Sequence, residues 1–187
     1  MQEGAGIRPG YRQATASDAV AIAAVHADSW RRNYRGAYTD EYLDGDVNAE
    51  RLSVWTGRFD AARATERTIV ADLGGEVVGF AHTALDDDPT WGALLDNLHV
   101  VHGLKRRGIG AGLMDAVAAL VLEARPSSGL YLWVLEQNVA AQGFYAARGG
   151  TCVGRELSSP FPGGGRAPKL RYAWPDPRTL LSQVRGD

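Results

Sequence analysis

The chain has 187 residues, with 20 lysines and arginines against 22 aspartates and glutamates, which gives a formal net charge of −2. This near-neutral balance lacks the basic excess that binding to a nucleic-acid backbone requires. Apolar residues make up 45% of the chain and charged residues 22%, a globular composition that excludes a disordered chain. We expect one folded domain, because single domains usually have about 100–200 residues.

The cysteine content and the lengths of the apolar runs indicate the cellular compartment of the protein. Cys152 is the only cysteine, so it can form neither an internal disulfide nor a cysteine-rich zinc site, and a reducing compartment is expected. The longest apolar runs, residues 19–25 and 116–122, are far too short to cross a bilayer, and no signal-peptide pattern stands at the start. The histidines lack metal-ligand spacing. We therefore expect a cytoplasmic protein with no membrane partner, no nucleic-acid partner and no metal.

The first part of the chain predicts a leader, a short strand and helices. Residues 1–10 carry three glycines and a proline without periodicity, which is typical of a flexible leader. Residues 11–14 predict a strand, and N-capping residues then precede a helix expected over about 18–32. A second helical stretch over about 39–62 is expected to break at Gly45.

Extended segments follow. Residues 67–72 and 76–83 predict two strands, and the pair Gly74-Gly75 between them suits a hairpin turn that requires positive φ. The segment Asp86-Asp87-Asp88-Pro89 is interpreted as a polar loop. Residues 92–101 are rich in apolar side chains and predict a further strand.

The remaining segments alternate between helices and strands. They are a helix over 105–124, a strand over 129–135, a helix over 138–148, a strand over about 151–156, a loop over 158–168 and a strand over 169–174. Prolines then predict a weakly structured tail over 175–187. A hairpin combined with strand–helix–strand crossovers predicts one mixed α/β (α+β) domain over residues 11–174, with a central sheet of about six to seven strands and about four helices.

A basic, glycine-rich turn connects the strand at 92–101 to the next helix. It reads Lys105-Arg106-Arg107-Gly108-Ile109-Gly110. Glycines let a ligand approach the backbone closely, and the first turn of a helix offers free N–H groups at the positive end of its dipole. The three cations add positive charge at the same place. These features predict a pyrophosphate site.

Three phosphate-binding motifs can be compared with this turn. A P-loop is excluded because no lysine follows Gly110 or Gly112, and a dinucleotide fingerprint is excluded because Leu113 stands where its third glycine belongs. The Arg/Gln-x-x-Gly-x-Gly/Ala element of acetyltransferases matches, with Lys105 in its first position. The alternative is a plain basic turn before a surface helix.

A second segment extends the match. Residues 132–150 run from a strand through Asn138, two alanines and Phe144-Tyr145 to a closing glycine, about 30 residues after the turn. This pattern resembles the second signature of the GNAT superfamily of N-acetyltransferases, and with the implied element order the resemblance covers roughly residues 11–174. Residues 29–36 also resemble a segment common among small bacterial members.

The resemblance implies a single-domain GNAT fold and acetyl-CoA as acyl donor. In the family the pyrophosphate rests on the backbone of the glycine turn, here residues 106–111, and the pantetheine arm pairs with the end of the preceding strand. The implied cofactor contacts are Leu98, His99, Val100, Lys105, Arg106, Arg107, Gly108, Ile109, Gly110, Ala111, Asn138 and Tyr145.

Acyl transfer from a thioester to an amine requires a proton for the leaving thiolate and donors for the developing oxyanion. Tyr145 suits the first role, because a phenol of pKa about 10 can donate to a thiolate whose thiol has a pKa of about 8.5. The resemblance makes Tyr145 the general acid and the backbone N–H of Leu98 the oxyanion donor. The alternative for Tyr145 is a core tyrosine whose hydroxyl is hydrogen-bonded.

The general base is sought on the strand before the turn. Alternation puts Leu94, Asp96 and Leu98 on one side of the strand and Asn97 and His99 on the other. Asp96 matches a base-bearing position of the family, but its ordinary pKa of about 3.9 suits it better to hold a water or the substrate ammonium. The alternative is a structural bond to a neighbouring loop. His99 is expected to face away and to be packed and hydrogen-bonded.

Aromatic residues are expected to edge the acceptor site. Trp30 and Tyr34 lie in the early helical region that edges this site in the family, where aromatic rings can enclose an amine. Packing of the helix onto the sheet explains them equally well. Trp133 stands five residues before Asn138, where relatives that acetylate ribosomal proteins often carry a glutamate. That activity is therefore disfavoured, and an aromatic acceptor wall is favoured.

The sequence thus predicts transfer of an acetyl group from acetyl-CoA to a primary amine of a small molecule or peptide. Direct attack in a ternary complex is preferred, because Cys152 is poorly placed to serve as a nucleophile. Two alternatives stay open. They are a non-catalytic acyl-CoA-binding sensor module and an aminoglycoside-type acetyltransferase. A homodimer is one option for the oligomeric state.

Overall fold

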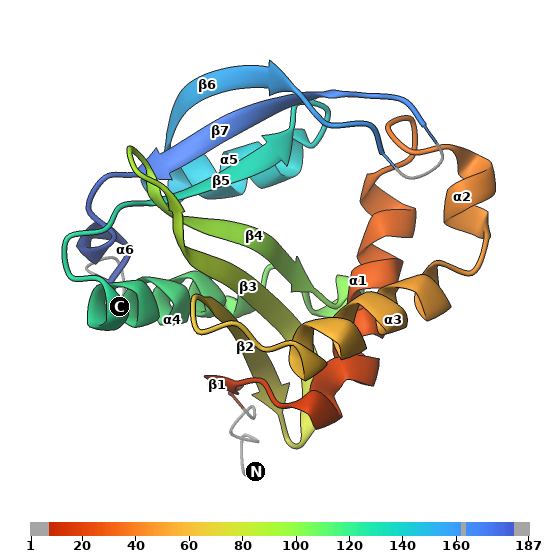
Figure 1. Ribbon diagram of the computed structural model, residues 1–187, viewed down its shortest axis with the longest axis horizontal. Coiled ribbons are helices and arrows are strands. Elements are labelled where there is room, and N and C mark those ends of the chain that lie inside the picture. Colours follow the sequence, from red (N-terminus) through yellow and green to blue (C-terminus); the bar gives the residue numbers. More distant parts are fainter. Residues whose placement is uncertain (1–7, 162–163, 182–187) are drawn as a thin grey trace, which may run out of the picture.

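The structure of the chain is a computed structural model that describes residues 8–161 and 164–181. Seven strands form one sheet in the order β1-β2-β3-β4-β5-β7-β6, with helices on both faces (Figure 1). Only β4 and β5 pair in parallel; the other neighbours are antiparallel. The elements are β1 (Gly10–Gln13), η1 (Ala16–Asp18), α1 (Ala19–Asn33), α2 (Asp40–Asp44), α3 (Val47–Asp60), β2 (Glu66–Leu73), β3 (Glu76–Asp88), β4 (Gly92–Val100), η2 (His102–Leu104), α4 (Ile109–Ala124), β5 (Leu130–Leu135), α5 (Val139–Ala147), β6 (Thr151–Leu157), β7 (Pro168–Trp174) and α6 (Arg178–Leu181).

The predicted mixed sheet and most element bounds are confirmed. The described residues hold six helices rather than about four, because α2 and α6 are short helices of five and four residues. Alternation along β2 sends side chains to two separate cores. Ile69 packs with Leu113 of α4, whereas Val70 packs with Trp55 of α3 on the opposite face. The sheet is therefore covered by α4 on one face and by α1 and α3 on the other.

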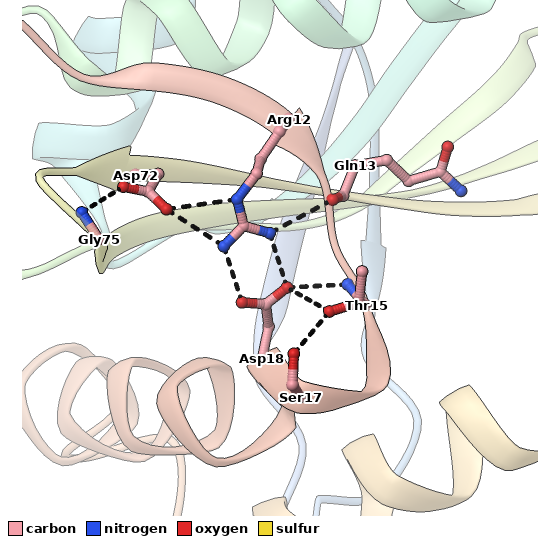
Figure 2. A network of polar contacts seen from close by, with 7 residues as sticks. All are labelled: Arg12, Gln13, Thr15, Ser17, Asp18, Asp72 and Gly75. Atoms are coloured by element: carbon pink, nitrogen blue, oxygen red, sulfur yellow. Dashed lines mark hydrogen bonds and ion pairs between the residues drawn. The ribbon is translucent and has the colours of Figure 1, made fainter.

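A polar network ties β1 to the start of α1 and to the end of β2 (Figure 2). The Arg12 guanidinium donates to both carboxylate oxygens of Asp18, at 2.8 and 2.9 Å, and also to Asp72. Asp18 accepts the Thr15 backbone N–H at 2.8 Å, which completes the expected cap ahead of α1. Asp72 in turn accepts the Gly75 N–H of the β2–β3 turn. Bonding to Arg12 lowers the pKa of Asp18 to about 2.

Two expected elements have different bounds. β3 continues through the acidic run to Asp88, where we expected a loop, because Asp88 pairs with Gly92 and Asp86 is ion-paired with Arg125 at 2.6 Å. Such cross-chain partners cannot be read from local composition. The helix expected from Lys105 begins only at Ile109, because η2 and a tight turn take up the residues before it.

Both ends of the chain carry structure inside the stretches expected as leader and tail. Gly10 already belongs to β1, and residues 1–7 lie outside the described residues. In the stretch expected as a tail, α6 packs on α4, and Leu180 is fully buried in the core that lies between α4 and the sheet. Residues 182–187, and 162–163 of the expected loop at 158–168, also lie outside the described part.

The pairing of β4 with β5 is short, and this positions the site. Only Ala93–Leu130 and Leu94–Tyr131 are paired, although β4 runs on to Val100 and β5 to Leu135. The two strands therefore diverge from a joined end. Between Leu95 and Val100, the edge of β4 that faces β5 has no strand partner in the part of the chain that the structure describes.

Two glycines, Gly92 and Gly129, lie against each other at the end where β4 and β5 are joined. Gly92 has φ +86°, and a Cβ there would lie 2.4 Å from the carbonyl oxygen of Gly129. We expect Gly92→Ala to reduce the free energy of unfolding by roughly 3 kcal/mol or more, because left-handed strain of about 1–3 kcal/mol adds to a backbone clash. Urea unfolding measures this. Gly74→Ala is the control, because φ there is +66° but nothing lies within 4 Å. Equal losses in both variants would contradict the role of the contact.

Candidate active site

A cavity of about 400 Å³ occupies the space where β4 and β5 diverge. Its wall is formed by β4, the turn after it, the start of α4, β5, α5 and the last turns of α1. Segments from residue 29 to residue 145 therefore meet at one place. Figure 1 shows α5 beside β5 and α1 on the other side of this opening.

The backbone of β4 presents free groups to this cavity. The Val101 N–H donates to the Val78 carbonyl oxygen at 2.9 Å, so residue 101 points toward β3. In an antiparallel pair the direction alternates from residue to residue, so His99 also points toward β3 while Leu98 and Val100 point away from it. The N–H and carbonyl groups of Leu98 and Val100 thus face the diverging β5.

A β-bulge in β4 changes which side chains share a face. Asn97 pairs with His82 and Leu95 with Thr83, so Asp96 is an extra residue without a partner on β3. Asp96 reaches Arg58 of α3 at 3.1 Å, and His99 reaches Ser29 of α1. The prediction that Asp96 and His99 lie on opposite faces is therefore wrong, because it assumed strict alternation. Leu98 instead packs in the core against α4.

The turn after β4 has the backbone geometry of an anion cradle. Arg106 has φ +63° and Gly108 has φ +81°, and a turn with left-handed residues can direct successive backbone N–H groups to one side. Gly108 is the N-cap of α4, and Gly110 lines the cavity with only a side-chain contact 3.4 Å from the position of its missing Cβ. The backbone can therefore approach a ligand, which is what the glycine spacing predicts.

The predicted cofactor residues divide into two groups. Most of them line the cavity, namely Leu98, His99, Val100, Lys105, Arg106, Gly108, Gly110, Ala111, Asn138 and Tyr145. Two do not line it. The side chain of Ile109 is 3% exposed in the core beneath α4, and Arg107 is exposed away from the cavity. Sequence spacing alone does not separate inward from outward positions at a turn.

Tyr145 lies on α5 with its ring packed and its hydroxyl without a hydrogen-bond partner among the described residues. Its ring contacts those of Phe144, Tyr172 and Trp174 at centroid distances of 5.4, 6.1 and 6.2 Å. Burial raises the pKa of Tyr145 above its ordinary value of 10, and Tyr34 adds to the shift. The phenol is therefore protonated at neutral pH. The ring packs as a core tyrosine would, yet the hydroxyl is left available.

Asn138 positions the helix that carries Tyr145. It is the N-cap of α5, and its side-chain oxygen accepts the Ala141 N–H at 3.2 Å. Because Asn138 both caps α5 and lines the cavity, the start of α5 is fixed relative to the space between the strands.

His99 is packed and hydrogen-bonded, as expected. Its Nδ1 lies 2.8 Å from the Ser29 hydroxyl, and its ring stacks on that of His26 at 4.8 Å. Burial, with a smaller contribution from Lys105, lowers the pKa of His99 to about 4. His99 is therefore neutral at pH 7.

Three polar residues of the cavity wall, Ser29, Asn33 and Asn97, were assigned no role from the sequence. Ser29 and Asn33 stand four residues apart on α1, and the Asn33 amide donates to the Ser29 carbonyl at 2.8 Å. Asn97 has a buried side-chain oxygen without a partner in the described part of the chain. The i,i+4 spacing of polar residues in an apolar helix was a usable signal for Ser29 and Asn33. No sequence pattern indicates Asn97, because its position depends on the bulge.

The acceptor end is aromatic and charged. Tyr34 and Trp133 line the cavity, whereas Trp30 does not; it is 9% exposed and packs with Tyr38 at 5.0 Å and under the Arg51 guanidinium at 4.1 Å. Packing explains Trp30 without a ligand. Burial, aided by the charge of Asp96, raises the pKa of Tyr34 to about 12.

No group of three or more histidine, cysteine, aspartate or glutamate side chains in residues 8–161 and 164–181 could hold a metal ion. Within the same ranges, each helix is too short or too polar to cross a bilayer.

Comparison with known proteins identifies the family to which the chain belongs. The model of the acetyltransferase (GNAT) family matches residues 25–150. A Mycobacterium tuberculosis protein named "Probable N-acetyltransferase Rv2775" is 26% identical over 162 residues, which is 86% of this chain and 90% of that protein. A Bacillus subtilis protein named "Uncharacterized N-acetyltransferase YuaI" is 29% identical over 92% of this chain and 98% of its own length.

A solved structure agrees with the fold. The PaiA N-acetyltransferase of Thermoplasma acidophilum, in complex with coenzyme A, matches with a TM-score of 0.68 at 16% identity over 89% of this chain and 99% of that one. The chain has the GNAT fold, a mixed sheet in which β4 and β5 diverge beside a glycine-rich turn. The chain belongs to the acetyltransferase (GNAT) family, and acyl transfer is the general activity that this membership supports.

Proposed function

We propose that the chain transfers an acetyl group from acetyl-CoA to a primary amine of a small molecule or peptide, by direct attack while both substrates are bound. One observation carries the proposal: a single cavity is lined both by the anion cradle after β4 and by Tyr145, whose hydroxyl has no hydrogen-bond partner in residues 8–161 and 164–181. The relatives named N-acetyltransferases and the coenzyme A complex of the Thermoplasma protein support it.

The residues present fit coenzyme A. The left-handed turn at Arg106 and Gly108, with the first N–H groups of α4, would hold the pyrophosphate, and Lys105 and Arg106 add charge at the cavity wall. The free edge of β4 at Leu98 and Val100 would pair with the amide groups of the pantetheine arm. Bound acetyl-CoA supplies an activated thioester carbonyl.

The chain contributes two groups to the transfer. The carbon–sulfur bond of the thioester breaks as the carbon–nitrogen bond forms, and the Tyr145 hydroxyl gives its proton to the departing sulfur. The Leu98 N–H points into the space between the strands, where it would donate to the oxygen that gains negative charge. The neutral amine loses one proton as its new bond forms, and this proton returns through water to the Tyr145 oxygen. An acceptor that enters as an ammonium first gives a proton to water.

Asp96 is assigned to the acceptor amine. Arg58 occupies its Oδ2 at 3.1 Å, which leaves Oδ1 to accept a hydrogen bond from the ammonium or from a water beside it. Because the Asp96 side chain lines the cavity and is 39% exposed, we assign it the positioning of the acceptor amine.

An amine panel tests the activity. Purified protein is incubated with acetyl-CoA and amines of several chemical classes, and the acetylated amine is measured by mass spectrometry, because the exposed free thiol of Cys152 would react with a thiol dye. The expected result is one acetylated class and no acetylated protein cysteine. Binding of coenzyme A without turnover of any amine would contradict the enzyme and favour a binding module.

A charge placed in the cradle tests the donor site. Ala111 lines the cavity in the first turn of α4, where a glutamate favours the helix but repels a pyrophosphate. We expect Ala111→Glu to raise the Kd for coenzyme A by roughly 10- to 100-fold, as titration calorimetry would measure. Ala119→Glu is the control, because it adds the same charge at an exposed position outside the cavity wall. Equal Kd values for the two variants would contradict the assignment of the coenzyme A site to this turn.

A further inference from the structure

Two cations lie on the acceptor side of the sheet, against the aromatic wall. Trp133 pairs directly with Arg171 across β5 and β7, and Lys169 lies two residues away from Arg171, so all three side chains share one face. The Lys169 ammonium lies 4.2 Å from the centre of the Trp133 ring and the Arg171 guanidinium 4.4 Å from it. β5 and β7 run side by side in Figure 1.

The rings around Arg171 hold it in place. Its guanidinium also lies 5.3 Å from the Trp91 ring and 5.4 Å from the Tyr131 ring. Cation–ring contacts of this kind fix a guanidinium plane without using its N–H groups. The donors of Arg171 are therefore left for another partner.

Asp88 attracts Arg171 through space but does not form a direct ion pair with it. Arg171 makes no ion pair within 4.0 Å in the described residues, and its buried Nε has no hydrogen-bond partner there. Asp87 accepts the Tyr131 hydroxyl, and Asp88 accepts the N–H groups of Thr90 and Trp91. A buried donor on a charged group is costly when it is left unpaired.

The second cation has only an exposed partner. Lys169 is paired with Glu156 at 3.0 Å, and the Glu156 side chain is 50% exposed on the edge strand β6. Exposed pairs contribute little and are readily exchanged for a better partner. Lys169 can therefore turn to an anion bound over Trp133.

We propose that the acceptor is an amine that also carries an anionic group, a carboxylate or a phosphonate, and that Arg171 and Lys169 bind this group beside Trp133. This rests on the proposed function and names its substrate class. Trp133 connects the two ends of the acceptor site, because this residue lines the cavity and its ring contacts both cations. The amine end meets Asp96 and Tyr34 in the cavity, and the anionic end meets Arg171, whose planar fork suits an oxyanion.

Acceptors that differ only in charge test this. Amino acids, their α-amides and the matching aminophosphonates are compared as acceptors, which separates a carboxylate from a phosphonate preference. For wild-type protein we expect the charged acceptors to have a kcat/KM roughly 10- to 100-fold above that of the amides. We expect Arg171→Met to remove this preference through KM, with kcat and the Kd for coenzyme A unchanged, and Arg171→Lys to restore part of it.

A matched control separates charge at this position from charge in general. Arg155→Met removes a cation that is 60% exposed on β6 and is already ion-paired with Glu136. It should leave the preference intact. If Arg171→Met changes the KM of acids and amides equally, or changes neither, the anion site is wrong although the acetyltransferase activity stands.

A binding measurement keeps the inference testable if no amine is acetylated. N-acetyl amino acids and their amides are titrated into protein that holds coenzyme A, with calorimetry as readout. Tighter binding of the acids, lost in Arg171→Met, would support the anion site while the proposed reaction fails. Equal binding of acids and amides would overturn the anion site.

Discussion

Replacement of Tyr145 by phenylalanine is expected to lower kcat by about 10²- to 10³-fold and to leave the Kd for coenzyme A within about threefold of wild type. The ring of Tyr145 makes its contacts through carbon atoms, and its hydroxyl has no partner in the described residues. Phenylalanine therefore keeps the packing and removes only the proton donor. Steady-state kinetics with an accepted amine and calorimetry with coenzyme A measure the two quantities.

Tyr172→Phe is the matched control for this variant. Tyr172 is 8% exposed, its ring lies 6.1 Å from that of Tyr145, and it does not line the cavity. Loss of that hydroxyl should leave kcat unchanged. Because its raised pKa keeps Tyr145 protonated at neutral and mildly basic pH, the wild-type rate should show no loss of activity from Tyr145 ionisation below pH 10. A Tyr145→Phe variant with wild-type kcat would remove the general acid from the mechanism.

The predictable part of the site is the part set by local backbone rules. Gly108 is needed because the turn after β4 requires positive φ, and Asn138 is needed because α5 requires a cap. Each requirement is local, so spacing in the sequence was sufficient to locate the cradle and the helix of Tyr145. The same holds for the strands of the first hairpin, whose turn at residues 74 and 75 has two positive φ angles.

The unpredictable part depends on partners far away in the chain. The faces of Asp96 and His99 were assigned wrongly, because a bulge is a property of two paired strands and not of β4 alone. The Arg171–Trp133 contact joins residues 38 positions apart and exists only through the β5–β7 register. Trp30 illustrates the converse, since its aromatic character suited a ligand site equally well until the packing of α1 was known.

The free energy of unfolding is expected to fall by roughly 2 kcal/mol for each buried histidine between pH 7 and pH 5. Burial lowers the pKa values of His82 and His99 to about 4, and it lowers that of His26 further. In the unfolded chain each histidine titrates near 6.5. Between these values the unfolded state binds the extra protons, so stability is present above pH 6.5 and is lost as the pH falls toward 4.

The partners of these histidines make the neutral form necessary. The Trp55 indole N–H donates to His26 Nδ1 at 3.0 Å, which a protonated nitrogen could not accept. Near His82, Arg58 opposes protonation while Glu66 and Asp96 favour it, and burial outweighs both. Urea unfolding at pH 7, 6 and 5 measures the slope. His82→Gln, which can still bond the Thr68 hydroxyl, should reduce that slope by about one third. An unfolding free energy that is constant from pH 7 to pH 5 would mean that these imidazoles are not held neutral by the fold.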